Sequence, residues 1–161
     1  MTHRLFGYSD SAITINLDAI ITNWRYIDSL SAPSTKTAAM VKADGYGLGS
    51  GQVAMALVKA GCELFFVANL TEALELRAVF RQAGYNDLPI LVLHGIQSGQ
   101  EPDFAANQLV PVLNDLKQMS CWQLHAIKKS KKLPALLHFD TGMTRLGLDA
   151  DQTDWLINNK Q

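Results

Sequence analysis

Lys42 is the residue of this chain best placed for covalent chemistry. It follows Thr37–Val41, whose apolar run has the length and composition of a buried parallel strand, and it precedes a glycine-rich turn at residues 45–51. Sites in α/β folds are built at the C-terminal ends of such strands. Partial desolvation there favours the neutral form of an amine, which can attack an aldehyde. The position therefore suggests a lysine that binds an aldehyde cofactor covalently.

A simpler interpretation of the same residues is open. A lysine at the end of a strand often packs its stem and leaves its ammonium in water, and a glycine cluster can form a plain turn. However, residues 41–49 read VKADGYGLG and resemble the motif around the lysine that carries pyridoxal phosphate in alanine racemases. The resemblance favours the chemical interpretation of Lys42.

A second block resembles the same family. Residues 138–148 read HFDTGMTRLGL and are similar to the family's Asp-Thr-Gly-Met-x-Arg-Leu-Gly segment, at about the expected distance from Lys42. The resemblance extends along nearly the whole chain through Ile13–Ile20, Ile90–Leu93 and Leu109–Leu113. From these motifs the chain is identified as a truncated, N-terminal part of an alanine racemase, without the C-terminal β domain that family members carry.

The resemblance implies a role for each of four residues. Lys42 would hold the cofactor and act as one of two catalytic bases, and Tyr46 would help to hold the cofactor phosphate through its hydroxyl. Leu93 would line the cofactor pocket. Arg145 would reach the cofactor's phenolic oxygen and the substrate carboxylate, a task that suits a guanidinium because it donates two hydrogen bonds in one plane.

Three of these residues also have structural alternatives. Tyr46 could be a turn aromatic that packs on the following helix, and Leu93 could be a core residue at a strand end. Arg145 could be a loop arginine paired with Asp140 or Asp149.

The chain departs from the family pattern at two positions. His138 stands where many members have a lysine that becomes carbamylated and orients the arginine, and Leu48 stands where members commonly have histidine. An imidazole cannot form that stable carbamate. We therefore expect another anion or a neutral acceptor to hold Arg145.

Alternating apolar and polar residues predict a strand over Ser11–Leu17, and Asp18 is expected to cap a helix that ends near Leu30 and packs on a sheet. Beyond Lys42, helices are predicted over 50–60, 71–82, 102–106 and 116–129, and strands over 64–68, 89–93, 109–113 and 135–139. A helix that begins near Ser50 would offer free amides to an anion.

These repeated βα units predict an α/β fold with a parallel sheet that is either doubly wound or curled into a barrel. The first βα turn lacks the Gly-x-Gly-x-x-Gly of dinucleotide folds. The family resemblance favours a TIM-type (β/α)8 barrel, which needs roughly 250 residues when complete. The 161 residues of this chain are therefore expected to form one partial barrel, residues 1–161, with about five of the eight strands.

The charge and the distribution of apolar residues exclude some classes of binding partner. The formal net charge of −1 gives no basic surface for nucleic acid or an anionic membrane, and no window is apolar enough for a transmembrane helix. The first residues lack a secretory signal, so a cytoplasmic location is expected. Cys62 and Cys121 are predicted to be buried thiols, and the histidines show no metal-ligand spacing.

The resemblance implies that the complete protein converts L-alanine into D-alanine for the peptidoglycan of the cell wall, with pyridoxal phosphate as cofactor and an amino acid as substrate. In the family, the second base is a tyrosine from the β domain of a partner subunit, and later strands supply most phosphate contacts. We therefore expect this chain alone to be inactive. The family predicts a homodimer, and the open strand near residues 136–139 predicts self-association.

Three other functions stay open. The complete protein could be a racemase of the same fold that acts on serine or on a broader set of amino acids. It could be a non-catalytic barrel that binds pyridoxal phosphate, although such proteins lack the motif over residues 140–145. The chain could also be a fragment with no activity of its own.

Overall fold

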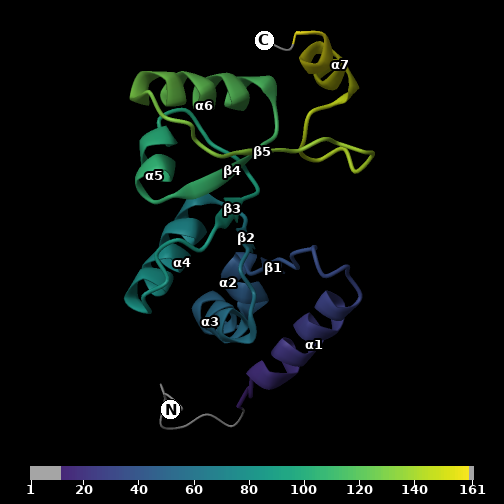
Figure 1. Cartoon of the computed structure of the whole chain (residues 1–161), viewed down its shortest axis with the longest axis vertical. Coiled ribbons are helices and arrows are strands. Elements are labelled where there is room, and N and C mark those ends of the chain that lie inside the picture. The colour runs from purple at the N-terminus through teal and green to yellow at the C-terminus, as the bar shows by residue number, and fades with distance from the viewer. Residues whose placement is uncertain (1–11, 160–161) are drawn as a thin grey trace.

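The structure, a computed structural model, describes residues 12–159. Its helices are α1 (Leu17–Ser29), α2 (Lys42–Gly47), α3 (Ser50–Ala60), α4 (Leu70–Gln82), α5 (Glu101–Ala106), α6 (Leu116–Lys129) and α7 (Ala150–Asn158). Its strands are β1 (Ala39–Met40), β2 (Phe65–Val67), β3 (Ile90–Val92), β4 (Leu109–Leu113) and β5 (Leu136–Leu137). After β1, which is followed by both α2 and α3, strands and helices alternate from β2 to α7 (Figure 1). None of the described helices combines the length and the apolar character needed to cross a bilayer.

The strands form one sheet of five parallel strands in the order β1-β2-β3-β4-β5. The register runs straight across the sheet: Phe65 pairs with Ala39 on one side and with Ile90 on the other, and Ile90 pairs with Leu109. Strands that follow one another in the chain are therefore neighbours in the sheet. The predicted α/β class with five parallel strands is confirmed.

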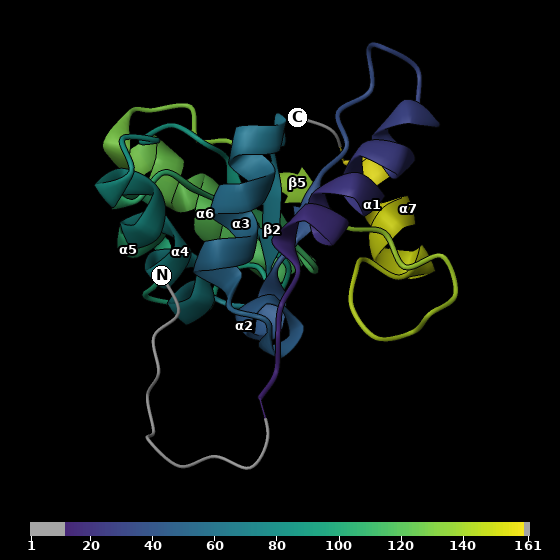
Figure 2. The same cartoon turned by 90° about the horizontal axis from the view of Figure 1, so that it is seen from below.

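Helices α3, α4, α5 and α6 lie on the same side of the strands in both Figure 1 and Figure 2. Residues paired across parallel strands point to the same face, and successive residues point to opposite faces. The row on the helix side is at most 6% exposed: Ala39, Phe65, Ile90 and Leu109. In the next row, Met40 is 38% exposed, Phe66 and Val110 are half-buried, and Leu91 in the middle of the sheet is 4% exposed. Coverage of one face is the arrangement of a barrel wall, whereas a doubly wound sheet carries helices on both faces.

Local capping explains where several helices begin. Side-chain oxygens accept a hydrogen bond from a first-turn amide of α1, α4, α6 and α7, and they belong to Asn16, Asn69, Asp115 and Asp149. The predicted bounds of α3, β4 and α6 are confirmed to the residue. The predictions for β1, β2, β3 and β5 each extend one or two residues beyond the observed strand at both ends. Helix α7 was not predicted.

The N-terminal prediction is partly wrong. Residues 12–16 form no strand, and α1 is capped by Asn16, whose side chain accepts from the amide of Ala19 at 3.0 Å. Asp18 therefore lies inside the first turn. Helix α1 packs mainly on α3, and its Trp24 indole donates to the carbonyl oxygen of Thr37 at 3.2 Å. Ile27, expected to face a sheet, is 53% exposed.

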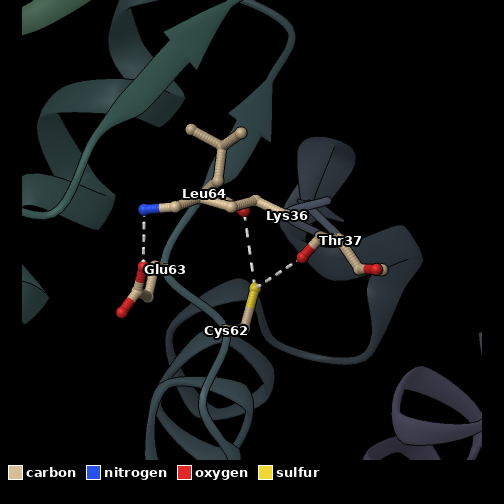
Figure 3. Close-up of polar contacts among 5 residues, drawn as sticks. All are labelled: Lys36, Thr37, Cys62, Glu63 and Leu64. Atoms are coloured by element: carbon tan, nitrogen blue, oxygen red, sulfur yellow. Dashed lines mark hydrogen bonds and ion pairs between the residues drawn. The ribbon is translucent and has the colours of Figure 1, made fainter. Parts of the chain in front are cut away.

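Polar contacts join the segments that lead into β1 and β2 (Figure 3). The Lys36 ammonium lies 2.8 Å from the Glu63 carboxylate and lowers the pKa of that exposed carboxyl. The Cys62 thiol lies 3.5 Å from the carbonyl oxygen of Leu64, and burial raises its pKa. The predicted burial of Cys62 is confirmed, whereas Cys121 is only half-buried.

Candidate active site

The C-terminal ends of the parallel strands form one rim, and the four predicted site residues come from segments that leave it. Lys42 lies two residues after the end of β1, and Leu93 directly follows β3. Both side chains are half-buried. Tyr46 lies in α2 and is 62% exposed. Arg145 lies in the exposed loop between β5 and α7. Because β1 and β5 are the two edges of the sheet, Lys42 and Arg145 belong to its opposite edges.

The segment after Lys42 is a left-handed helical turn and not the plain glycine turn that the sequence suggested. Ala43, Asp44, Gly45 and Tyr46 have φ of 52°, 52°, 63° and 58°. A left-handed conformation costs on the order of 1–2 kcal/mol for each residue that carries a Cβ. Three of these four residues do, so surrounding contacts must hold the turn. Backbone strain of this kind is concentrated at functional sites.

Two carboxylates hold this turn. The Asp44 side chain accepts from the amide of Ser50 at 2.8 Å, while the Asp44 carbonyl oxygen accepts from the amide of Gly49 at 2.8 Å. The Glu72 side chain accepts from the amide of Ala43 at 3.1 Å. Of the amides at the start of α3 that were expected to be open to an anion, that of Ser50 is therefore already taken by a carboxylate of the chain itself.

Glycine is required at position 45. A Cβ built there would lie 3.2 Å from the backbone of Ser50, and φ at this position is +63°. The left-handed turn can therefore pass close to the start of α3 because residue 45 has no side chain. This close approach lets Asp44 reach the amide of Ser50.

A second set of polar contacts joins the ends of β3, β4 and β5. The Asn114 amide nitrogen donates to the carbonyl oxygens of Leu93 and Val112 at 2.8 and 2.9 Å. The Asn114 oxygen must then face His138, whose Nδ1 lies 2.9 Å away. Nδ1 therefore donates in this contact, and Nε2 of a neutral His138 ring is free to accept. The His138 ring is thus held in place by Asn114 through Nδ1.

The loop that carries Arg145 is organised by Asp140. Its carboxylate accepts from the amides of Thr144 and Gly142 at 3.0 and 2.9 Å, and these contacts lower the pKa of Asp140. The loop is closed by paired backbone bonds, since Leu148 donates to the His138 carbonyl oxygen and Asp140 donates to the Leu148 carbonyl oxygen.

The alternative in which Arg145 pairs with a loop carboxylate is not realised. Asp140 accepts loop amides, and Asp149 accepts from the amide of Gln152 at the start of α7. Within residues 12–159, the single ion pair joins Lys36 to Glu63. The Arg145 side chain is exposed.

The chemical groups of the four predicted site residues match those of pyridoxal phosphate. An amine at Lys42 matches its aldehyde, a phenol at Tyr46 and a guanidinium at Arg145 can donate to its oxygens, and Leu93 is apolar. A large hollow among the described residues has a different location. It measures about 980 Å³, lies between α6 and α7, and is lined by residues such as Trp122, Ile127 and Trp155 but by none of the four predicted site residues.

Sequence reasoning missed Asp44, Glu72 and Asn114. Asp44 lies inside the recognised motif, and Asn114 directly follows β4, where a buried polar residue could have been noticed. Glu72 was seen only as part of a helix start. Its contact with Ala43 joins residues 29 positions apart, and no local pattern reports such a contact.

The comparisons with known proteins agree on one family. Residues 15–160 match the family model described as "Alanine racemase, N-terminal domain". The alanine racemase of Brucella abortus is 48% identical over 147 residues, which cover 91% of this chain and 36% of the relative. The alanine racemase of Rickettsia prowazekii is 42% identical over 148 residues, 92% of this chain and 35% of the relative. The chain thus spans about a third of the length of these relatives.

Solved structures give the same result. The alanine racemase from Bartonella henselae, with covalently bound pyridoxal phosphate, superposes with a TM-score of 0.84 and 41% identity. The alignment covers 90% of this chain and 41% of that structure. The alanine racemase from E. faecalis superposes with a TM-score of 0.76 and 30% identity over 89% of this chain and 38% of that structure. The predicted partial barrel is confirmed, and the chain belongs to the alanine racemase N-terminal domain family.

Proposed function

We propose that this chain is the lysine-bearing part of an alanine racemase and that Lys42 is its catalytic residue. The observation that carries the proposal is the position of Lys42 at the C-terminal end of β1, where a strained left-handed turn fixes the backbone that follows it. The similarity to the Bartonella henselae enzyme, whose structure holds pyridoxal phosphate covalently, supports the same cofactor here.

Each residue of the site then has a defined task. Pyridoxal phosphate, once bound, supplies an electron sink that makes the Cα proton of an amino acid acidic. The Lys42 amine removes or returns that proton on one face of Cα. The Arg145 guanidinium donates to the substrate carboxylate, and the Tyr46 hydroxyl donates to the cofactor phosphate. Leu93 contributes an apolar wall next to the ring.

Racemisation requires proton exchange on both faces of Cα, and we assign one face to this chain. The other base and most phosphate contacts belong, in this proposal, to the two thirds of the relatives' length that the chain does not span. The complete protein would then be a cytoplasmic homodimer that makes D-alanine for the cell wall. The chain by itself would bind cofactor without appreciable turnover of L-alanine into D-alanine.

The test is to add pyridoxal phosphate to the purified chain, reduce with borohydride and locate the modified lysine by peptide mapping. Lys42 is expected to be the labelled residue, and Lys42→Arg is expected to remove the label. Lys59→Arg is the matched control, because Lys59 is exposed on α3 away from the rim. Label spread over exposed lysines with Lys42 unmodified would contradict the proposal. Formation of D-alanine by the chain at the rate of a complete racemase would contradict the assignment of one face.

A further inference from the structure

Glu72 ties together the C-terminal ends of two neighbouring strands. Its half-buried carboxylate lies at the start of α4, with Oε1 3.1 Å from the amide nitrogen of Ala43 and Oε2 2.8 Å from that of Ala68. Ala43 directly follows Lys42, and Ala68 directly follows β2. Each oxygen thus accepts one backbone hydrogen bond, and the two donors leave adjacent strands of the sheet.

Helix capping explains only half of this arrangement. Asn69 is the N-cap of α4, and its side chain accepts from the amide of Glu72 at 3.1 Å. A glutamate three positions after the cap often accepts from the backbone just before the helix, which accounts for the contact with Ala68. The contact with Ala43 crosses to the preceding βα unit and does nothing for the start of α4. It instead holds the residue that begins the left-handed turn.

We propose that Glu72 is a positioning residue for Lys42. The amide of Ala43 belongs to the peptide group that joins Lys42 to the turn, so a charged acceptor on that amide fixes the orientation of this peptide plane. The Lys42 side chain leaves the backbone at Cα, which is one of the six atoms of that plane, so a fixed plane restricts the directions open to the side chain. The inference rests on the proposed function of Lys42 as the residue that holds the cofactor.

Three variants separate positioning from stability. Glu72→Gln keeps the shape but replaces one acceptor oxygen with an NH₂ group, which cannot accept from an amide. Glu75→Gln is the matched control, because Glu75 is exposed on the same helix. The double variant Glu72→Gln/Ala43→Gly tests rescue: Ala43 has a φ of 52°, a conformation that glycine adopts without a steric cost. For each protein, the rate at which pyridoxal phosphate and borohydride label Lys42 is measured together with the urea midpoint.

We expect Glu72→Gln to slow the labelling of Lys42 roughly tenfold, the loss expected when one charge-assisted hydrogen bond that holds the reactive conformation is removed. Ala43→Gly should restore part of that rate in the double variant, and Glu75→Gln should match the wild type. Amide exchange at Ala43 and Ala68 should accelerate in Glu72→Gln.

Three results would overturn the inference, and they can be told apart. If the wild-type chain labels at Lys42 and Glu72→Gln labels at the same rate, the positioning role alone is wrong. If Glu72→Gln is slower but its loss follows the urea midpoint and Ala43→Gly restores nothing, Glu72 acts only on stability. If the wild-type chain does not label at Lys42, the proposed function fails and the positioning role fails with it.

Discussion

At the scale of single residues, Arg77 shows how a charge is accommodated in this core. Its side chain is 1% exposed, and its guanidinium donates to the carbonyl oxygens of Asn107, Asn86 and Gln108 at 2.9, 2.9 and 3.1 Å. Burial, followed by the nearby Arg81, lowers the pKa of Arg77. One side chain on α4 thus satisfies carbonyl groups in two loops, which lie before β3 and before β4.

We predict that Arg77→Met destabilises the chain by roughly 3 kcal/mol or more, because three carbonyl groups lose a charged donor whose own side chain is 1% exposed. Arg81→Met is the control: it lies on the same helix, is exposed, and should cost about 1 kcal/mol or less. Urea denaturation followed by circular dichroism gives both values. Equal losses for the two variants would show that the buried contacts of Arg77 carry no special weight.

The two thiols should differ in reactivity. Burial raises the pKa of Cys62 and keeps reagents away from it, whereas Cys121 on α6 is half-buried. We predict that a disulfide reagent at neutral pH modifies Cys121 faster than Cys62 by on the order of tenfold or more, since the thiolate is the reactive form. Each rate is assigned with Cys62→Ser and Cys121→Ser. Faster modification of Cys62 would contradict this order.

At the scale of elements, the sequence predicts those helix and strand bounds that are set by residues close together in the chain. The bounds of α3, β4 and α6 are confirmed because periodicity, Gly61 after α3 and Asp115 before α6 all act within a few residues. The left-handed turn after Lys42 could not be predicted, because its non-glycine residues are held by Glu72 from a different βα unit. Helix α7 was missed although Asp149 marks its start.

For the candidate site, too, the sequence predicts one part and not another. The family motifs supply the identities of Lys42, Tyr46, Leu93 and Arg145, and the parallel topology brings their segments to one rim. The contacts that support the site were outside the reach of the sequence. Asn114 binds the ends of β3 and β5 through groups 21 and 24 positions away.

The loop between β5 and α7 should respond to acid. Amides of Thr144 and Gly142 lower the pKa of Asp140, so the folded loop favours the ionised carboxylate. The stability that the ionised Asp140 carboxylate gives to the loop is fully present above the ordinary aspartate pKa of about 3.9. It is lost as the pH falls through the lowered pKa of the folded state. We predict that amide exchange at these two positions, corrected for its intrinsic pH dependence, loses protection over that interval.

The same loop offers a test at neutral pH. Trypsin can cut after Arg145, and we predict faster cleavage there in Asp140→Ala, because two loop amides lose their acceptor. Asp154→Ala is the control, since Asp154 is an exposed carboxylate on α7 outside the loop. Unchanged cleavage at Arg145 in Asp140→Ala would mean that the paired backbone bonds at Leu148 suffice to order the loop.

At the scale of the whole molecule, the sheet has one covered face and two edges. Helices α3 to α6 cover one side, and β1 and β5 lie at the ends of the strand order (Figure 1). Apolar side chains are exposed at both edges: Met40 is 38% exposed, and Leu136 and Leu137 are 44% and 41% exposed. An edge strand also presents unpaired backbone groups to any strand that approaches. Both edges of the described sheet therefore offer backbone groups and apolar side chains to which another strand can pair.

We therefore predict that the chain self-associates through β5. Replacing Leu137 with lysine places a charge on this edge, which opposes strand addition, and should shift the chain toward monomer in sedimentation velocity at increasing concentration. Leu124→Lys is the matched control: Leu124 is 56% exposed on α6, so the same charge is added away from the sheet edge. The control should associate like the wild type. A wild-type chain that stays monomeric at high concentration, or a Leu137→Lys variant that associates unchanged, would remove β5 as the contact, and the apolar groove between α6 and α7 would then be the next surface to alter.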